Sequence, residues 1–335
     1  MDKKPKMTIN RREFLMASAA SLAALPALAP GFLKAEPSEP GTKVVLIKTG
    51  DRKKGVQEAF RFLDASGIKG KRVFIKPNFN TADSTPGSTH NDTLAQIVLE
   101  AKGRGAAGIT VGERSGPPDT RQVMEDKGIP HLAGELGFNV INFEDLKEED
   151  WVKFNPSGIH WSEGFYVPKA AVDAEYFIST CCLKTHGYGG VFSMSLKLAV
   201  GLTPKRLMRE LHGARQGNMR NMIAEINLGY KPKLIILDGV EAFVDGGPSR
   251  GKSVQAEVFI AGTDRVAVDA TGLAVLKDLG SNPAIMDMKI FDQEQIKRAA
   301  ELGLGISDPS QIELVTPDDS SRLYAAKLKT ILAQG

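Results

Sequence analysis

Short apolar runs alternate with amphipathic segments along most of this 335-residue chain. The apolar runs have the length and the branched side chains of buried strands. They predict strands at 43–48, 72–76, 108–113, 139–143, 175–183, 233–239, 257–262 and 311–315. Strands that alternate with helices in this way favour a mixed α/β fold, in which a largely parallel sheet is flanked by helices.

The segments between these runs repeat apolar residues at helical spacing. They predict helices at 53–65, 91–104, 191–202, 204–212, 218–228, 265–279, 292–302 and 319–333, with Thr89 as the cap of the second helix and His90 in its first turn. Residues 151–168 predict a small antiparallel cover over one edge, and 241–251 a glycine-rich loop. We expect one α/β domain over 43–335, with a two-lobed division near 150–175 as the alternative.

The first 35 residues have a different pattern from the rest. The stretch around Arg11 and Arg12, Asn-Arg-Arg-Glu-Phe-Leu-Met, resembles a twin-arginine export signal and precedes a weakly apolar, alanine-rich run. A linker at 36–42 follows. That run is too weakly apolar for a stable membrane span. We therefore expect export in folded form by the twin-arginine translocation machinery to the periplasm, with anchoring by the leader as the alternative.

Charge and cysteine content narrow the classes of function. The formal net charge is +3, but residues 1–35 hold a surplus of four basic residues, which leaves −1 for the remainder. A near-neutral body argues against a nucleic-acid-binding protein. The two cysteines, Cys181 and Cys182, are adjacent and cannot build a disulfide framework. Without a Cys-x-x-Cys motif, the ligands for a protein-bound iron–sulfur cluster are missing.

Polar residues gather at or directly after the ends of several predicted strands. The carboxyl ends of parallel strands meet at one edge of a sheet, where ligands bind in this fold class. We therefore expect a binding site at this edge. The residues concerned, taken as ligands of a small anionic substrate or as reacting groups, are Lys76, Asn78, Glu113, Ser115, Lys184 and His186.

Lys197 lies in a predicted helix that is apolar on almost every face. Burying a lysine is costly unless a partner or a ligand compensates. Lys197 is thus a candidate anion clamp or an amine with a lowered pKa, and a lysine that reaches solvent is the alternative. If Lys76 and Lys184 converge with it, the three would bind phosphate, carboxylate or another oxyanion. The alternative for those two is neutralisation of nearby carboxylates.

Three histidines are candidate functional groups. His90 and His186 lie at predicted strand–helix junctions and suit acid–base chemistry. His212, near a helix end, is a candidate substrate ligand, or else a cation favoured by the helix dipole.

Several carboxylates are candidates for metal binding. Glu113, Asp238 and Asp245 could hold Mn, Fe or Zn with one or two of the histidines, while turn hydrogen bonding is the alternative. Asp264 is expected to cap a helix, and Asp269 inside an apolar helix is a further site candidate.

An ordered set of short motifs runs through the chain. It comprises Ile75-Lys-Pro-Asn78, Thr89-His90, Gly112-Glu113, Leu183-Lys-Thr-His186, Ser195-Leu-Lys197, Leu237-Asp-Gly239, Gly247-Pro248, Gly262-Thr-Asp264 and Ala267-Val-Asp269. The set resembles domain of unknown function 362, a family of uncharacterised proteins, from about Val44 to Gly305. Some members carry a ferredoxin-like segment with cysteine-bound iron–sulfur clusters, which this chain lacks. The family usually has asparagine where this chain has Leu198. The resemblance implies a fold and a site but no reaction.

Together these features predict an exported enzyme that acts on a small anionic substrate. Lys76, Lys184 and Lys197 would clamp the substrate, and His90 or His186 would exchange protons with it. A divalent metal on the carboxylates would polarise it. The alternative is a non-catalytic periplasmic ligand-binding or cofactor-handling protein that has the same pocket.

Overall fold

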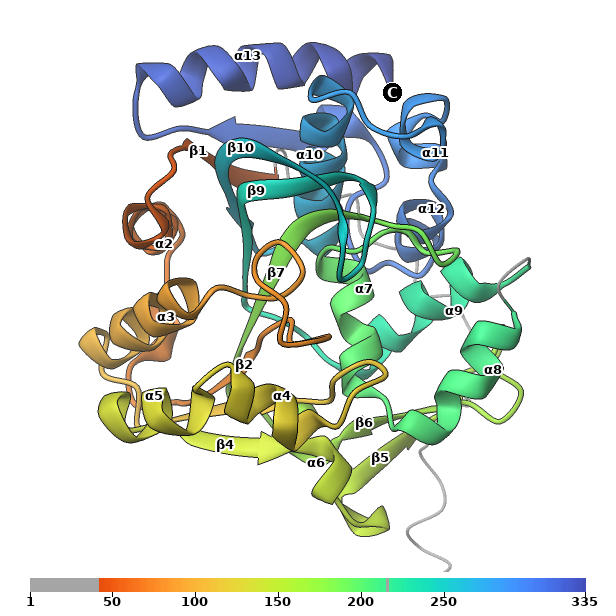
Figure 1. Ribbon diagram of the computed structural model, residues 1–335. Helices are drawn as coiled ribbons and strands as arrows, with labels where there is room; N and C mark the ends of the chain where they lie inside the picture. The colour runs from red at the N-terminus through yellow and green to blue at the C-terminus, as the bar shows by residue number, and fades with distance from the viewer. Residues whose placement is uncertain (1–41, 215–216) are drawn as a thin grey trace, which may run out of the picture. The chain divides into compact units, whose positions relative to one another are not determined.

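Parallel pairing dominates the central sheet of the computed structural model, which describes residues 42–214 and 217–335 (Figure 1). The main strands are β1 (Thr42–Lys48), β2 (Arg72–Lys76), β3 (Gly108–Glu113), β4 (Asn139–Asn142), β7 (Tyr176–His186), β9 (Leu234–Gly246), β10 (Gly251–Gly262) and β11 (Ile312–Val315). Their spatial order is β11-β1-β10-β9-β7-β2-β3-β4. Among these described strands only β10 runs antiparallel to its neighbours. The predicted mixed, largely parallel sheet is confirmed.

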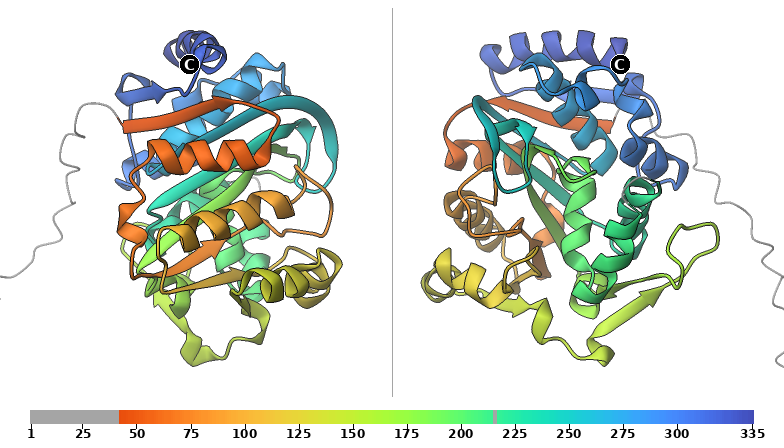
Figure 2. Two further views of the ribbon diagram at one scale, coloured as in Figure 1. Left: turned by 90° about the vertical axis from the view of Figure 1, so that its left-hand side faces the viewer. Right: turned by 45° about the vertical axis from the view of Figure 1, so that its right-hand side comes forward.

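Helices cover both faces of this sheet because its strands are apolar on both sides. In β1, Val45 and Ile47 face one core, while Val44 and Leu46 face the other. The first core packs under α2 (Arg52–Phe62), α3 (Asn91–Gly103), α4 (Thr120–Asp126) and α5 (Ile129–Leu136). Figure 2 shows α2 and α3 lying across the sheet.

The opposite face carries α6 (Lys169–Val172), α7 (Ser195–Leu198), α8 (Met208–Gly213), α9 (Met219–Ile226), α10 (Arg265–Asp278), α11 (Pro283–Met286), α12 (Glu294–Glu301) and α13 (Asp319–Gln334). None of the helices described here is long and apolar enough to cross a bilayer. The described residues all belong to one compact unit, Pro37–Gly335. The twin-arginine motif with Arg11 and Arg12 lies outside the described residues, as does the linker up to residue 41.

The strand order reverses next to β2. From β2 the chain adds β3 and then β4 on one side, and it returns to place β7 on the other side of β2. The returning stretch contains a small antiparallel sheet of β5 (Trp151–Phe154) and β6 (Phe165–Pro168), as predicted. The reversal creates a switch point between the carboxyl ends of β2 and β7, where parallel α/β sheets form their ligand crevices.

Two predictions of local structure were wrong. The expected loop at 241–251 is a hairpin, because β9 and β10 continue to pair as far as Gly246 and Gly251. Only the tip between these strands turns, and Gly246 and Gly247 adopt the positive φ that glycine tolerates. The expected helix at 191–202 is split into β8 (Val191–Phe192), α7 and a 3-10 turn, Ala199–Leu202. It is split because Phe192 and Ser193 donate backbone hydrogen bonds to Gly190 and Lys184 instead of a helical ladder.

Candidate functional site

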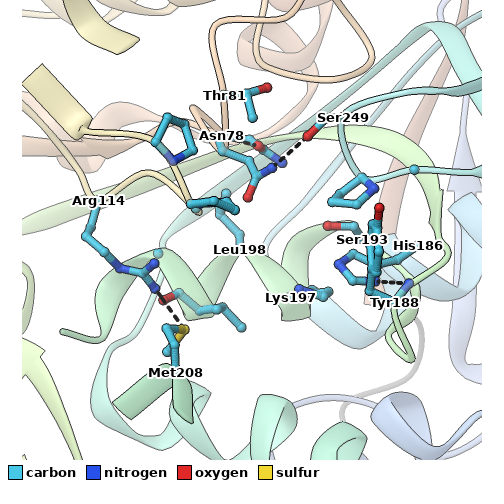
Figure 3. Close-up of a pocket in the computed structure, with 18 of the residues that line it drawn as sticks. Asn78, Thr81, Arg114, His186, Tyr188, Ser193, Lys197, Leu198, Met208 and Ser249 are labelled. Atoms are coloured by element: carbon cyan, nitrogen blue, oxygen red, sulfur yellow. Dashed lines mark hydrogen bonds between the residues drawn. The ribbon is translucent and has the colours of Figure 1, made fainter. Parts of the chain in front are cut away.

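A pocket of about 790 Å³ opens at the switch point between β2 and β7 (Figure 3). The ends of β2, β3 and β7 form its floor, the β9–β10 hairpin tip forms one wall, and α7 and α8 contribute the opposite side. Its polar and charged lining residues are Lys76, Asn78, Asn80, Thr81, Glu113, Arg114, His186, Tyr188, Ser193, Lys197, Lys205, His212, Ser249 and Arg250. Glu113 is the one acidic residue in this described lining, so the pocket is predominantly basic.

Lys76 does not offer a free charge to this pocket. Its ammonium contacts the Glu113 carboxylate and donates to the Pro77 carbonyl at 2.6 Å. Glu113 also accepts the backbone N–H of Phe79 at 2.6 Å. Gly201 passes so close that a Cβ there would lie 2.9 Å from the lysine nitrogen. Burial lowers the pKa of Lys76, and the charge of Glu113 opposes that shift. The pair forms a nearly neutral part of the wall.

Lys184 lies behind the pocket wall, outside the lining. Its buried ammonium donates to the carbonyls of Gly87 at 2.6 Å and Pro248 at 2.9 Å. It therefore ties the loop after β2 to the hairpin tip. Burial lowers the pKa of Lys184, since neither contact is a full negative charge. The structure makes this lysine a support for the pocket, where the sequence predicted a clamp.

Lys197 lines the pocket with a partly buried side chain. Among the residues that the structure describes, it makes no ion pair and no hydrogen bond. Burial lowers the pKa of Lys197 to about 7, and the charges of Lys184 and Arg114 add to this effect. Lys197 is thus an amine that titrates near neutral pH.

His186 is the neighbour of Lys197 in the pocket (Figure 3). A Cβ on Gly190 would lie 2.8 Å from both the lysine Cε and the histidine Nδ1, so these two atoms are no more than twice that distance apart. The histidine Nδ1 accepts the backbone N–H groups of Tyr188 and Gly190 at 3.3 Å each. Burial, followed by the charges of Lys197 and Lys184, lowers the pKa of His186 well below its usual value. The ring is therefore neutral, and its proton is on Nε2.

Sequence reasoning missed Arg114, although it directly follows Glu113 at the end of β3. Its buried guanidinium donates to the carbonyls of Thr203 at 2.8 Å, Ser115 at 2.9 Å and Val200. No carboxylate pairs with it among the described residues, and burial lowers its pKa to about 10. Arg114 adds a fixed positive charge to the side of the pocket that lies away from His186 (Figure 3).

Three further residues were predicted to bind substrate. Two of them line the pocket, and the third is buried in the protein interior. Asn78 and the exposed His212 line the pocket. Ser115 is buried and donates its hydroxyl to the Phe79 carbonyl at 2.7 Å, so it supports the loop after β2.

His90 lies outside the pocket lining and has a different role from the one predicted. It caps α3, and its Nδ1 accepts the N–H of Asp92 at 3.1 Å. Thr89, the predicted cap, is engaged elsewhere, because its hydroxyl accepts the N–H of Asn78 at 2.9 Å.

The three candidate metal ligands are not brought together. Glu113 contacts Lys76, and Asp238 accepts hydrogen bonds from Arg52 at 3.0 Å and Thr93 at 2.6 Å. Asp245 is exposed and accepts the N–H of Gly246 at 2.8 Å. Within 42–214 and 217–335, no three His, Cys, Asp or Glu side chains form a group that could hold a metal ion. The structure therefore does not bring together, among these described residues, the carboxylates and histidines that the sequence predicted as a metal site.

Asp269 holds the helix that carries Lys197. Its buried carboxylate accepts the backbone N–H groups of Ser195 and Leu196, each at 2.8 Å, at the start of α7. Burial raises the pKa of Asp269 to about 7, against the lowering effect of the two N–H groups. The sequence singled out Asp269 as a site residue, and the structure places it beneath the pocket wall.

Comparison with known proteins gives relatives over most of the chain. A thylakoid-associated protein of Synechocystis sp. is 27% identical over 256 residues, which cover 72% of this chain and 74% of that protein. A lactate racemase apoprotein from Thermoanaerobacterium thermosaccharolyticum has a TM-score of 0.45 at 12% identity and matches 69% of this chain. A protein from Thermotoga maritima has a TM-score of 0.42 at 12% identity and matches 75%. This chain covers 57% and 58% of these two solved chains.

The family comparison covers more than half of the chain. Residues 73–274 match the family described as Domain of unknown function (DUF362). All of the pocket-lining residues lie within this match. The chain belongs to the domain of unknown function 362 family.

Proposed function

We propose that this protein is an enzyme that acts on a small organic anion bound in the pocket at the switch point. The observation that supports this proposal most strongly is the Lys197 amine, which borders the pocket without a carboxylate partner among the described residues. An unpaired cation in a partly buried site is costly unless a ligand supplies the opposite charge. Arg114 adds to the same positive field.

Lys197 and His186 have complementary chemical properties. At neutral pH the lysine is present both as an amine and as an ammonium, so it can accept or release a proton at little cost. The Nε2–H of the neutral imidazole is a hydrogen-bond donor that suits a substrate oxygen which gains negative charge during the reaction. This assignment makes His186 a donor and Lys197 the group that exchanges the proton.

The proposal is tested first by anion binding. Inorganic phosphate, acetate and pyruvate are titrated against the purified protein, and the rise in melting temperature is measured at pH 6 and pH 8. We expect stabilisation to be greater at pH 6, because an anion binds the ammonium form of Lys197. Lys197→Met should abolish most of the shift, and Lys197→Arg should retain it because the charge is kept.

A control and a second measurement separate the enzyme from a binder. Lys205 already pairs with Glu144 at 2.5 Å, so Lys205→Met should change anion binding much less than Lys197→Met. Turnover of a panel of small organic acids then distinguishes the two functions. Tight retention of a ligand without turnover would support a non-catalytic ligand-binding protein, and an unchanged shift in Lys197→Met would contradict the anion site.

We also propose that the enzyme works outside the cytoplasm after twin-arginine export. The support is the Arg11-Arg12 motif, which lies outside the described residues. Replacing both arginines by lysine should keep the protein in the cytoplasmic fraction. Normal export of that variant would contradict this part of the proposal.

A further inference from the structure

We infer that the substrate carries an aldehyde or ketone group, and that the amine of Lys197 bonds covalently to that carbonyl carbon. This inference rests on the proposed function and deepens it, because it names the chemical class of the anion and the bond that is formed. It makes Lys197 a nucleophile as well as a proton carrier.

The contacts of the pocket cations single out Lys197. Lys76 is paired with Glu113, Lys205 is paired with Glu144, and the guanidinium of Arg114 is held by backbone carbonyls. Lys197 is the one lysine of this described lining without such a contact. A nitrogen already engaged by an oxygen must break that contact before it attacks a carbon. The amine of Lys197 has no such contact among the described residues and can attack directly.

Burial first, and then the surrounding positive charges, keep this amine unprotonated more often than an ordinary lysine. Two cations bear on it, Lys184 from β7 and Arg114 from the end of β3, while the nearby Lys76–Glu113 pair is neutral as a unit. His186 beside it is an uncharged ring, so it supplies no negative charge that would favour the ammonium form. Desolvation together with neighbouring cations is a known way to make a lysine nucleophilic.

The proposed reaction balances without an oxidant, reductant or metal. The lysine nitrogen attacks the carbonyl carbon, a C–N bond forms, and the C=O π electrons move to oxygen. The Nε2–H of His186 donates a hydrogen bond to that oxygen while a proton passes from nitrogen to oxygen to give a carbinolamine. The nitrogen lone pair then expels the hydroxyl, which takes one proton from solvent and leaves as water. The product is a protonated imine that withdraws electrons from the adjacent carbon.

The pocket has room and charge for such a substrate. Its volume of about 790 Å³ is far larger than an inorganic anion needs, and its lining includes apolar side chains such as Leu198, Val200 and Met208. Figure 3 shows Arg114 and Met208 on one side of Lys197 and His186 on the other. A carbonyl placed at the amine can therefore have an anionic group directed to Arg114 and an oxygen directed to His186.

The test uses pyridoxal 5′-phosphate, an aldehyde with an anionic group, as a probe on the full chain. The protein is mixed with less than one equivalent at pH 7 in buffer without phosphate and reduced with borohydride. Peptide mass spectrometry then locates the secondary amines. At pH 7 the unprotonated fraction of an amine with a pKa of about 7 exceeds that of an ordinary lysine by roughly 1000-fold. We expect Lys197 to be labelled at least about tenfold faster than Lys205, and excess inorganic phosphate to protect it.

Lys197→Arg separates this inference from the proposed function. Arginine retains the charge but forms no stable imine, so the variant should still be stabilised by inorganic phosphate while the adduct at position 197 is lost. If the unaltered protein binds phosphate through Lys197 but gives no adduct there, the covalent step is wrong and the anion site stands. If phosphate gives no stabilisation in either protein, the anion site itself is wrong, and labelling of Lys197 alone would then report a reactive amine without an anion pocket.

Discussion

The charged cluster between α9 and α12 and the pocket at the strand ends both bury ions, but they balance charge differently. In the first, the fully buried Glu225 accepts from the Arg298 guanidinium at 2.9 and 3.0 Å and from the His160 ring at 2.6 Å. In the second, Lys76 and Glu113 are matched, whereas Lys197 has no negative partner among the described residues.

The difference separates ions that stabilise the folded protein through their partners from an ion that is free to contact a ligand. A matched buried pair recovers through its contacts part of the cost of leaving water, and it is damaging to break. An unmatched buried cation destabilises the folded protein until a ligand supplies the opposite charge. Relief of this destabilisation then contributes to the free energy of ligand binding. Substitutions of the matched ions and of the unmatched Lys197 should therefore change stability in opposite directions.

The largest effect is expected for Lys76→Met. Both partners of this pair are almost completely buried, with 1% and 2% of their side chains exposed. Methionine fills the space but leaves the Glu113 carboxylate without a cation, which should lower the free energy of unfolding by about 4 kcal/mol. Denaturant titration measures the loss. Lys205→Met, which breaks a partly exposed pair, should cost less than about 1 kcal/mol; similar losses would contradict the matched-pair interpretation.

Glu225→Gln should have the next largest effect. The amide leaves Arg298, whose side chain is 16% exposed, without its main carboxylate, and we expect a loss of about 3 kcal/mol. Urea unfolding followed by circular dichroism gives the value. The exposed Asp319–Arg322 pair supplies the control, because Asp319→Asn should change stability by less than about 0.5 kcal/mol. A loss below 1 kcal/mol for Glu225→Gln would show that the cluster does not hold the fold.

Asp269→Asn tests the link between the pocket wall and the core through pH. The folded pKa of Asp269 is about 7, above its usual value of 3.8, so between these values the folded chain binds the proton more often than the unfolded chain. This group therefore contributes stability at low pH that is lost as pH rises from 4 to 7. The excess stability of the unaltered protein over Asp269→Asn should fall by about 3 kcal/mol across that range.

Asp318 provides a control with the opposite sign. It caps α13, and the hydrogen bonds from Ser321 lower its pKa. Its contribution is present at neutral pH and is lost as pH falls below 4. The excess stability of the unaltered protein over Asp318→Asn should therefore rise with pH. The same slope in both variants would contradict the assignment for Asp269.

The smallest effect is a gain, expected for Lys197→Met. The folded pKa of Lys197, about 7, is below the usual lysine value of 10.5, so the folded chain gives up this proton before the unfolded chain does. The buried ammonium therefore destabilises the folded state most below pH 7, and this destabilisation decreases as pH rises from 7 to 10.5. We expect the variant to be about 1 kcal/mol more stable at pH 6, with a smaller gain at pH 9. Thermal unfolding at both values measures it, and a loss at pH 6 would show a partner for Lys197.

Local pattern in the sequence is enough to predict which residues gather at the candidate site. Lys76, Asn78, Glu113 and His186 lie at or just beyond the ends of apolar strands. The rule for parallel strand ends is enough to bring them to one edge. Their mutual contacts could not be predicted. Whether Lys76 faces Glu113 or the open pocket depends on how Gly201, more than 80 residues later, closes over the pair.

The failures have similar long-range causes. Asp245 and Gly246 have turn chemistry, yet they lie in a strand because Lys252 and Gly251 of β10 pair with them. Lys197, which the sequence singled out, lines the pocket, but its helix is shorter than its apolar pattern suggests. The first turn depends on the Asp269 carboxylate, which comes from another helix and is more than 70 residues away.

The position of β1 has a consequence for engineering. Every pocket residue lies within 73–274, so a fragment cut to the family match would keep all of the chemistry in its sequence. It would lack β1, which pairs with β10 from Val258 to Gly262 and joins it to β11. The fragment would expose unpaired backbone groups and an apolar strand edge, and such edges recruit other chains. Soluble production of the site therefore requires the flanking segments that contribute nothing to its lining.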